Sequence, residues 1–103
     1  MRRKPKYTIE EIRQKVTPIA KRHGVERVYL FGSYARGEAK AKSDLDLRID
    51  AGKIKTYFEL GGLYNDLEES LKMKVDILTT DALDEKFLNR IAKDEVLLYV
   101  ERT

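Results

Sequence analysis

The stretch RVYLFGSYARGEAKAKSDLDLRID, residues 27–50, decides the fold of this chain because it holds two predicted strands and the turn between them. Its first five residues, 27–31, are rich in β-forming side chains and predict a strand. Gly32-Ser33 follows and predicts a tight turn. Ser33 is expected to cap a short helix that runs through Arg36 and ends at Gly37.

The second predicted strand of this stretch spans residues 44–49. Its apolar side chains, Leu45, Leu47 and Ile49, alternate with charged ones. A period of two is typical of a half-buried strand, which would place Asp44 and Asp46 on one face.

The N-terminal part of the chain predicts a helix that ends near Gly24. Thr8 with Glu11 three residues later is a capping-box pattern. Pro18 lies inside the helical pattern and is expected to kink or shorten the helix.

Residues 53–72 predict the longest helix, with Tyr57 and Tyr64 in an apolar stripe that would face the core. Gly61-Gly62 should weaken this helix. The remaining segments predict a strand, a helix, and a short strand or packed tail, over residues 73–78, 84–93 and 96–100. This alternation indicates an α/β fold in which helices pack against one small sheet.

The composition is that of a folded chain, with 42% hydrophobic and 38% charged residues among 103. This length predicts a single domain, residues 1–103. No segment is apolar over a membrane span, and without cysteine there is neither a disulfide nor a thiolate zinc site. The net charge of +3 is spread along the chain, so direct nucleic-acid binding is not expected. A cytoplasmic protein is the simplest interpretation.

Two short motifs carry candidate chemistry. Gly32-Ser33 precedes a helix start, where a glycine lets the backbone approach a phosphate and free N–H groups can bind it. Asp44 and Asp46, two residues apart on one strand face, can share Mg²⁺ ions. Alone, the first motif is most often an ordinary turn, and the second a solvated strand face.

Asp76 adds a third carboxylate between Val75 and Ile77. By itself it can equally lie on a solvent face. If its strand lies beside the strand of Asp44 and Asp46, three carboxylates converge and repel one another. A pair of bound cations would relieve that repulsion and stabilise a phosphoryl displacement.

These motifs together resemble the signature of the minimal nucleotidyltransferases of the DNA polymerase beta-like superfamily. The matching segments are residues 31–37 (FGSYARG), 43–47 (SDLDL) and 74–78 (KVDIL), and the motif positions show no departure. The resemblance covers nearly the whole chain. It implies a small mixed β-sheet packed with helices, the polymerase beta-like palm core.

The resemblance also implies roles for individual residues. Asp44, Asp46 and Asp76 would be the catalytic metal ligands for two Mg²⁺ ions, with Asp76 nearer the acceptor hydroxyl. Gly32 and Ser33 would bind the terminal phosphates of the nucleotide. Arg36 could add positive charge there, or instead pair with Glu38. ATP is the donor that the family suggests.

Relatives of this type are often paired with a small helical toxin of the HEPN type. The resemblance therefore implies an antitoxin that forms a hetero-oligomer with this toxin and transfers AMP to one of its tyrosines. Two alternatives stay open: a non-catalytic module that neutralises the partner by occupancy, and nucleotidyl transfer to a small molecule.

Three further residues have open roles. Arg48 lies on the carboxylate face, where many relatives carry an apolar residue. It could steer phosphate, pair with Asp46 or Asp50, or simply be exposed at the strand end. His23 at a helix end is expected at the surface, and Tyr34 could flank a nucleotide or be half-packed.

Overall fold

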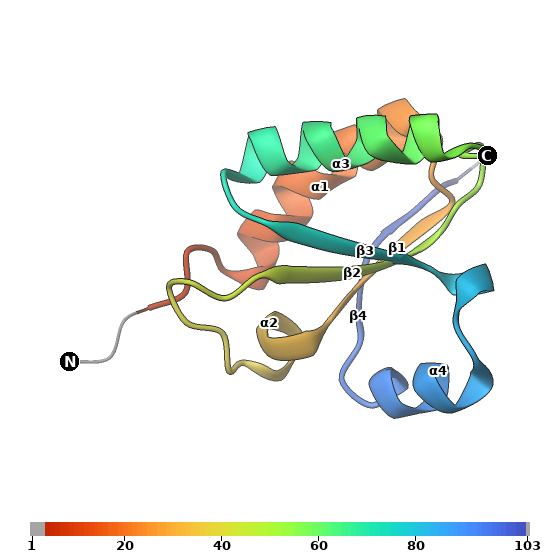
Figure 1. Cartoon of the computed structure of the whole chain (residues 1–103). Helices are drawn as coiled ribbons and strands as arrows, with labels where there is room; N and C mark the ends of the chain where they lie inside the picture. The colour runs from red at the N-terminus through yellow and green to blue at the C-terminus, as the bar shows by residue number, and fades with distance from the viewer. Residues whose placement is uncertain (1–3, 103) are drawn as a thin grey trace.

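A computed structural model describes residues 4–102, which form a mixed sheet with helices on both faces (Figure 1). The strand order is β3-β2-β1-β4. β1 is antiparallel to β2 and β4, and β2 is parallel to β3. The strands are β1 (Arg27–Phe31), β2 (Leu45–Asp50), β3 (Val75–Thr79) and β4 (Val96–Val100). The predicted α/β fold with a small mixed sheet is confirmed.

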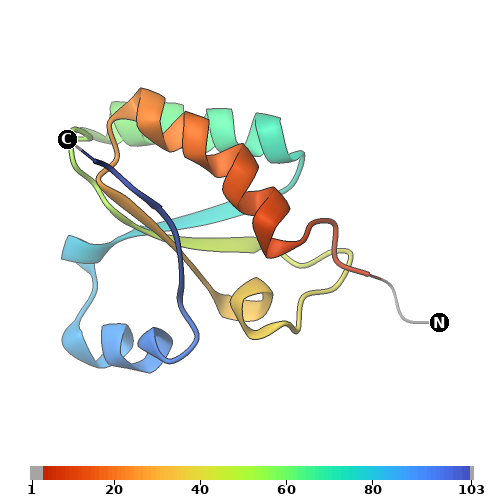
Figure 2. The same ribbon diagram turned by 180° about the vertical axis from the view of Figure 1, so that it is seen from behind.

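The helices divide between the two faces of the sheet. α1 (Ile9–His23) and α3 (Tyr57–Leu71) cover one face, while α2 (Gly32–Arg36) and α4 (Glu85–Ala92) lie on the other (Figure 1). A short 3₁₀ turn, η1 (Thr80–Ala82), leads from β3 toward α4. Seen from behind, β4 closes one edge of the sheet beside α1 (Figure 2). No helix among residues 4–102 is both long and apolar enough to cross a membrane.

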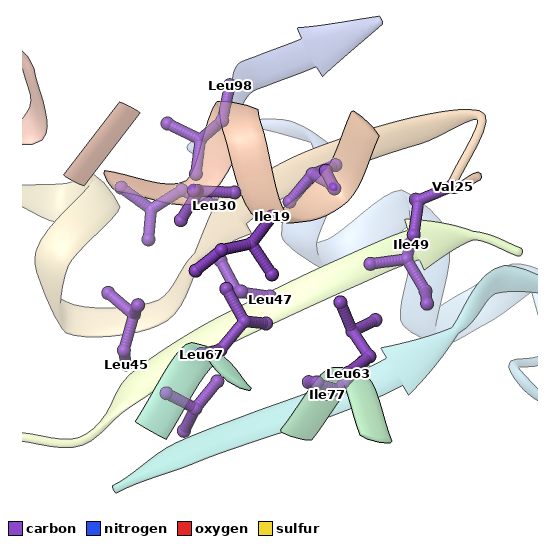
Figure 3. Close-up of a cluster of buried hydrophobic side chains, with 14 of the residues drawn as sticks. Ile19, Val25, Leu30, Leu45, Leu47, Ile49, Leu63, Leu67, Ile77 and Leu98 are labelled. Carbon is purple, nitrogen blue, oxygen red and sulfur yellow. The ribbon is translucent and has the colours of Figure 1, made fainter. Parts of the chain in front are cut away.

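The hydrophobic core lies between the sheet and the α1–α3 pair. The apolar residues of β2 point into it, as the alternation predicts, and meet side chains such as Ile19, Leu63 and Leu67 (Figure 3). Leu45 and Ile49 are fully buried. Because β2 alternates, its charged residues are directed to the opposite face, which carries α2 and α4.

The helix boundaries follow their caps more closely than their apolar patterns. The predicted capping box of Thr8 and Glu11 is present. An equivalent box, Thr56 with Glu59, starts α3 at Tyr57, four residues later than expected. Pro18 does not shorten α1, because it lies on the exposed side, where water can satisfy the carbonyl that it leaves unbonded.

Two side-chain expectations are wrong. Ser33 does not cap α2: the helix begins at Gly32, its N-cap is Phe31, and no side-chain cap bond forms. Tyr57 is not a core residue, since it is 93% exposed in the first turn of α3, beside Phe58 at 90%. Tyr64 packs against the core as predicted but is only half-buried, and its hydroxyl bonds to the backbone of Ile77.

Tyr34 is packed inside the fold rather than against solvent, at 4% exposed. Within the described residues its hydroxyl is buried without a hydrogen-bond partner, which costs about 1–3 kcal/mol. Tyr34→Phe should therefore keep or raise the free energy of unfolding, by up to about 1 kcal/mol. Urea denaturation measures this. A clearly lower midpoint in the variant would mean that the hydroxyl is bonded in solution.

Candidate active site

The strand register brings the two predicted motifs together. Asp46 on β2 lies opposite Phe31 on β1 and opposite Asp76 on β3. Directly paired residues of neighbouring strands share one face of a sheet, so the two aspartates lie side by side. Gly32 follows Phe31 and begins α2. The glycine turn and two of the three predicted carboxylates therefore meet at one place.

Gly32 has a conformation and a contact that require glycine. Its φ is +76°, in the left-handed region. A Cβ atom added there would overlap the Oδ2 atom of Asp46. The backbone of the turn is thus packed directly against the carboxylate. Ser33 is only partly buried in the first turn of α2, so the turn is accessible to a ligand.

Few groups of the described chain stabilise the negative charge of these carboxylates. Burial raises the pKa of Asp46, the charges of Asp76 and then Asp44 raise it further, and Arg36 opposes them. Among residues 4–102, none of these three carboxylates takes part in a side-chain hydrogen bond or an ion pair. The site therefore holds negative charge that a bound cation would stabilise.

Asp44 completes the set less closely than Asp46 and Asp76. It lies just before β2 and its side chain is exposed. As the side chains stand, no three acidic or histidine residues of the described chain are grouped as metal ligands. The donor set still fits Mg²⁺, because all three residues offer carboxylate oxygens and the charge of Asp44 already acts on Asp46.

Arg36 lies at the exposed end of α2. Its Nε donates to Oε1 of Glu38 at 2.8 Å, so this alternative for Arg36 is confirmed. The pair is largely solvent-exposed and contributes little to stability. Arg36 can therefore exchange Glu38 for a phosphate at low cost.

Arg48 is not an exposed strand-end residue, since its side chain is 12% exposed. It does approach Asp50, at 3.7 Å, but its main partner is Glu95, with Nε to Oε2 at 2.6 Å. Sequence reasoning missed this pair because 47 residues separate its members. It likewise missed that His23 is half-buried and bonded to Asp66 at 2.7 Å.

Removing the charge of Asp46 should stabilise the metal-free protein. The pKa of Asp46 is higher in the folded state than in the unfolded chain. The free energy of unfolding therefore falls as the pH rises past the unfolded pKa, and the loss is complete above the folded pKa. In EDTA at neutral pH, Asp46→Asn should melt at a higher temperature than the wild type, because the variant lacks the charge that folding disfavours.

The gain should shrink at acid pH, where the wild-type carboxyl is protonated in both states. Thermal melts at several pH values check this result. A variant less stable than wild type at neutral pH would show that the carboxylate has a favourable partner in the fold.

A strand, a glycine turn and a helix start, set against carboxylates on a mixed sheet, define an enzyme class that handles nucleoside phosphates. Residues 14–103 match the family model described as "Polymerase beta, Nucleotidyltransferase". The chain belongs to this nucleotidyltransferase family.

Similar proteins extend this result. A Methanocaldococcus jannaschii protein, assigned as a protein adenylyltransferase, is 41% identical over 88 residues, which are 85% of this chain and 95% of that protein. A crystal structure of a toxin–antitoxin with AMP-PNP matches with a TM-score of 0.74 at 20% identity, over 87% of this chain and 74% of that one.

A third similar structure is a tri-AMPylated Shewanella oneidensis HEPN toxin in complex with an MNT antitoxin. It has a TM-score of 0.69 at 17% identity and covers 91% of this chain and 74% of the other. At these identities both structures show the fold alone. Together with the family model, the fold confirms the predicted polymerase beta-like core.

Proposed function

We propose that this chain is a Mg²⁺-dependent protein adenylyltransferase built as one minimal domain. It transfers AMP from ATP to a tyrosine of a HEPN-type toxin partner and so acts as the antitoxin. The observation that carries the proposal is the contact of the Gly32 backbone with the Asp46 carboxylate, beside Asp76. The adenylyltransferase relative and the AMPylated toxin complex support the choice of group and acceptor. The cytoplasmic location stays a prediction.

On the donor side, Gly32 and Ser33 bind the terminal phosphates of ATP through the free N–H groups of the first turn of α2. Arg36, one turn further, moves from Glu38 to the same phosphates. Because these groups lie beside Asp46, the α-phosphate would lie at the carboxylates. The contribution of the protein is orientation and charge neutralisation.

On the acceptor side, Asp44 and Asp46 would hold two Mg²⁺ ions, and Asp76 would contact the ion nearer the acceptor. Bound Mg²⁺ neutralises the charge that develops on the α-phosphate and its leaving group. A carboxylate oxygen of Asp76 accepts the proton of the tyrosine hydroxyl. The tyrosine oxygen forms a new bond to the α-phosphorus. The bond between the α-phosphorus and the oxygen that bridges it to the β-phosphate breaks, and pyrophosphate leaves.

A second candidate is a module that neutralises its partner by binding alone. The observation in its favour is the pair Tyr57 and Phe58, which are 93% and 90% exposed at the start of α3, on the α1–α3 side of the sheet and away from the carboxylates. Large exposed aromatics are frequent contact residues in protein interfaces. This surface could bind a toxin without any transfer.

One experiment separates the two. The protein is incubated with ATP labelled on the α-phosphate, Mg²⁺ and the HEPN-type product of the adjacent gene, and label and toxin activity are both measured. Label on the toxin that is lost in Asp44→Asn supports transfer. Neutralisation without label, retained in Asp44→Asn, would overturn the enzyme in favour of the binding module.

A further inference from the structure

Arg48 has an unusually complete set of partners for a residue on the site face. Its guanidinium forms a two-pronged pair with Glu95, with Nε to Oε2 at 2.6 Å and Nη2 to Oε1 at 3.0 Å. Nη1 donates to the hydroxyl of Thr80 at 2.7 Å. The group also stacks on the ring of Tyr29 at 4.0 Å. The side chains of Arg48 and Glu95 are only 12% and 10% exposed.

These partners lie at the two ends of one segment. Thr80 follows β3 and begins the excursion of the chain away from the sheet, and Glu95 ends it just before β4. The segment between them, residues 81–94, contains α4. One guanidinium on β2 therefore holds both ends of this excursion. The Thr80 hydroxyl is itself fixed by Oδ1 of Asp50 at 2.6 Å and by the carbonyl of Ile49.

Apart from these ends, α4 is weakly attached. None of its residues is buried. Its specific contact with the sheet is Phe87 against Phe31, edge to face, with ring centroids 6.2 Å apart. Such a pair contributes about 0.5–1.5 kcal/mol beyond its buried area. The position of α4 therefore depends strongly on the Arg48 clamp, by which we mean Arg48 with Glu95 and Thr80.

The clamp is connected to the nucleotide turn through neighbouring residues. Phe31, on which α4 rests, immediately precedes Gly32 and lies opposite Asp46. At the second end, the pKa of Arg36 is raised first by its hydrogen bond to Glu38 and then by carboxylates that include Asp94. Both observations place the segment beside the Gly32–Arg36 turn.

We propose that Arg48 is a positioning residue, whose clamp on both ends of the 81–94 segment holds α4 as a wall of the donor-nucleotide pocket. It acts through α4 and need not touch ATP. The activity readout rests on the proposed function, whereas the mobility and binding readouts below do not. Removing one member of a buried pair leaves an unpaired charge, so the segment should detach locally.

The test uses Arg48→Met and Glu95→Gln, the second of which keeps the side-chain shape if the first fails to fold. Hydrogen exchange of residues 85–92, followed by mass spectrometry, should be at least about tenfold faster in both variants. The dissociation constant of a fluorescent ATP analogue with Mg²⁺ should rise about tenfold. Arg48→Lys should be intermediate, because a lysine keeps the charge but not the two-pronged geometry.

In transfer assays the KM for ATP should rise about tenfold with kcat within about twofold, because the carboxylates are unchanged. The matched control is Arg27→Met, which removes another arginine bonded to Asp50, at 3.2 Å, and leaves the bonds of Arg48 to Thr80 and Glu95 in place. It should leave exchange, binding and KM unchanged.

The proposal would be overturned if residues 85–92 of both variants exchanged hydrogen at the wild-type rate. It would also be overturned if exchange became faster while the dissociation constant of the ATP analogue stayed unchanged. A rise in the KM for the protein acceptor, with no rise in the KM for ATP, would place α4 at the acceptor site and not at the donor-nucleotide pocket. This result would also overturn the proposal. If wild type transfers no AMP at all, the proposed function fails, while exchange and analogue binding still decide the role of Arg48.

Discussion

Asp46→Asn is expected to lower AMP transfer by at least about 1,000-fold while the protein remains folded. The residue lies at the centre of the site, beside Asp76 and against the Gly32 backbone. An amide keeps the shape but loses the charge that a Mg²⁺ ligand needs. Loss of about 4 kcal/mol of transition-state stabilisation corresponds to this factor. Initial rates with α-labelled ATP measure the loss, and Asp44→Asn should behave alike.

Asp76→Asn should differ from these two variants. Its predicted role is on the acceptor hydroxyl, so it should slow the chemical step while ATP-analogue binding is kept. The matched control is Asp81→Asn, an identical change at an exposed aspartate of η1, which should transfer at the wild-type rate. Full activity in purified Asp44→Asn or Asp46→Asn would rule out the assignment of metal ligands.

Gly32→Ala is expected to reduce transfer by at least about 100-fold. The new Cβ would overlap the Asp46 carboxylate, and the flexible carboxylate can yield more easily than the backbone. Yielding displaces the catalytic group by a distance comparable to the 1 Å that can cost about 100-fold. The positive φ adds a stability cost of about 1–2 kcal/mol. Transfer rates and urea midpoints measure the two effects separately.

Gly37→Ala is the matched control for Gly32→Ala. Gly37 also has a φ of +74°, but an added Cβ there meets no atom of the described chain within 4 Å. The control should share the stability cost and retain transfer. Equal losses of activity in both variants would show that backbone strain, and not displacement of Asp46, explains the effect.

The sequence predicts the sheet strands well because each is short and its apolar residues alternate or cluster. β1 has the predicted bounds, Arg27–Phe31, and β2, Leu45–Asp50, starts and ends one residue later than the predicted strand 44–49. The predicted start of α3 is wrong because residues 53–56 continue the helical pattern, whereas the Thr56 cap begins the helix at Tyr57. The prediction that Tyr57 lies in the core is wrong for the same reason. Its spacing fits the apolar stripe, but Tyr57 is the first residue of α3 and does not reach the sheet.

The order and spacing of the motifs predict which residues belong to the site, but not how close together they lie. Gly32 and Asp46 lie close together because Phe31 and Asp46 are in register, and residue spacing alone does not fix a register. The Arg48–Glu95 pair is a contact between distant segments, and neither residue has a local signal. For Asp44 the sequence predicts more than the structure shows. Its motif predicts a metal ligand, but its side chain is exposed and does not form a group of three ligands with Asp46 and Asp76 within the described residues.

The most direct test is anomalous diffraction at the manganese edge, from crystals grown with Mn²⁺ and a non-hydrolysable ATP analogue. Mn²⁺ accepts the same oxygen ligands as Mg²⁺. We expect anomalous peaks bounded by the carboxylates of Asp44 and Asp46, one of them within reach of Asp76, with the terminal phosphates on Gly32-Ser33. Mn²⁺ and phosphates bound away from these residues would contradict it.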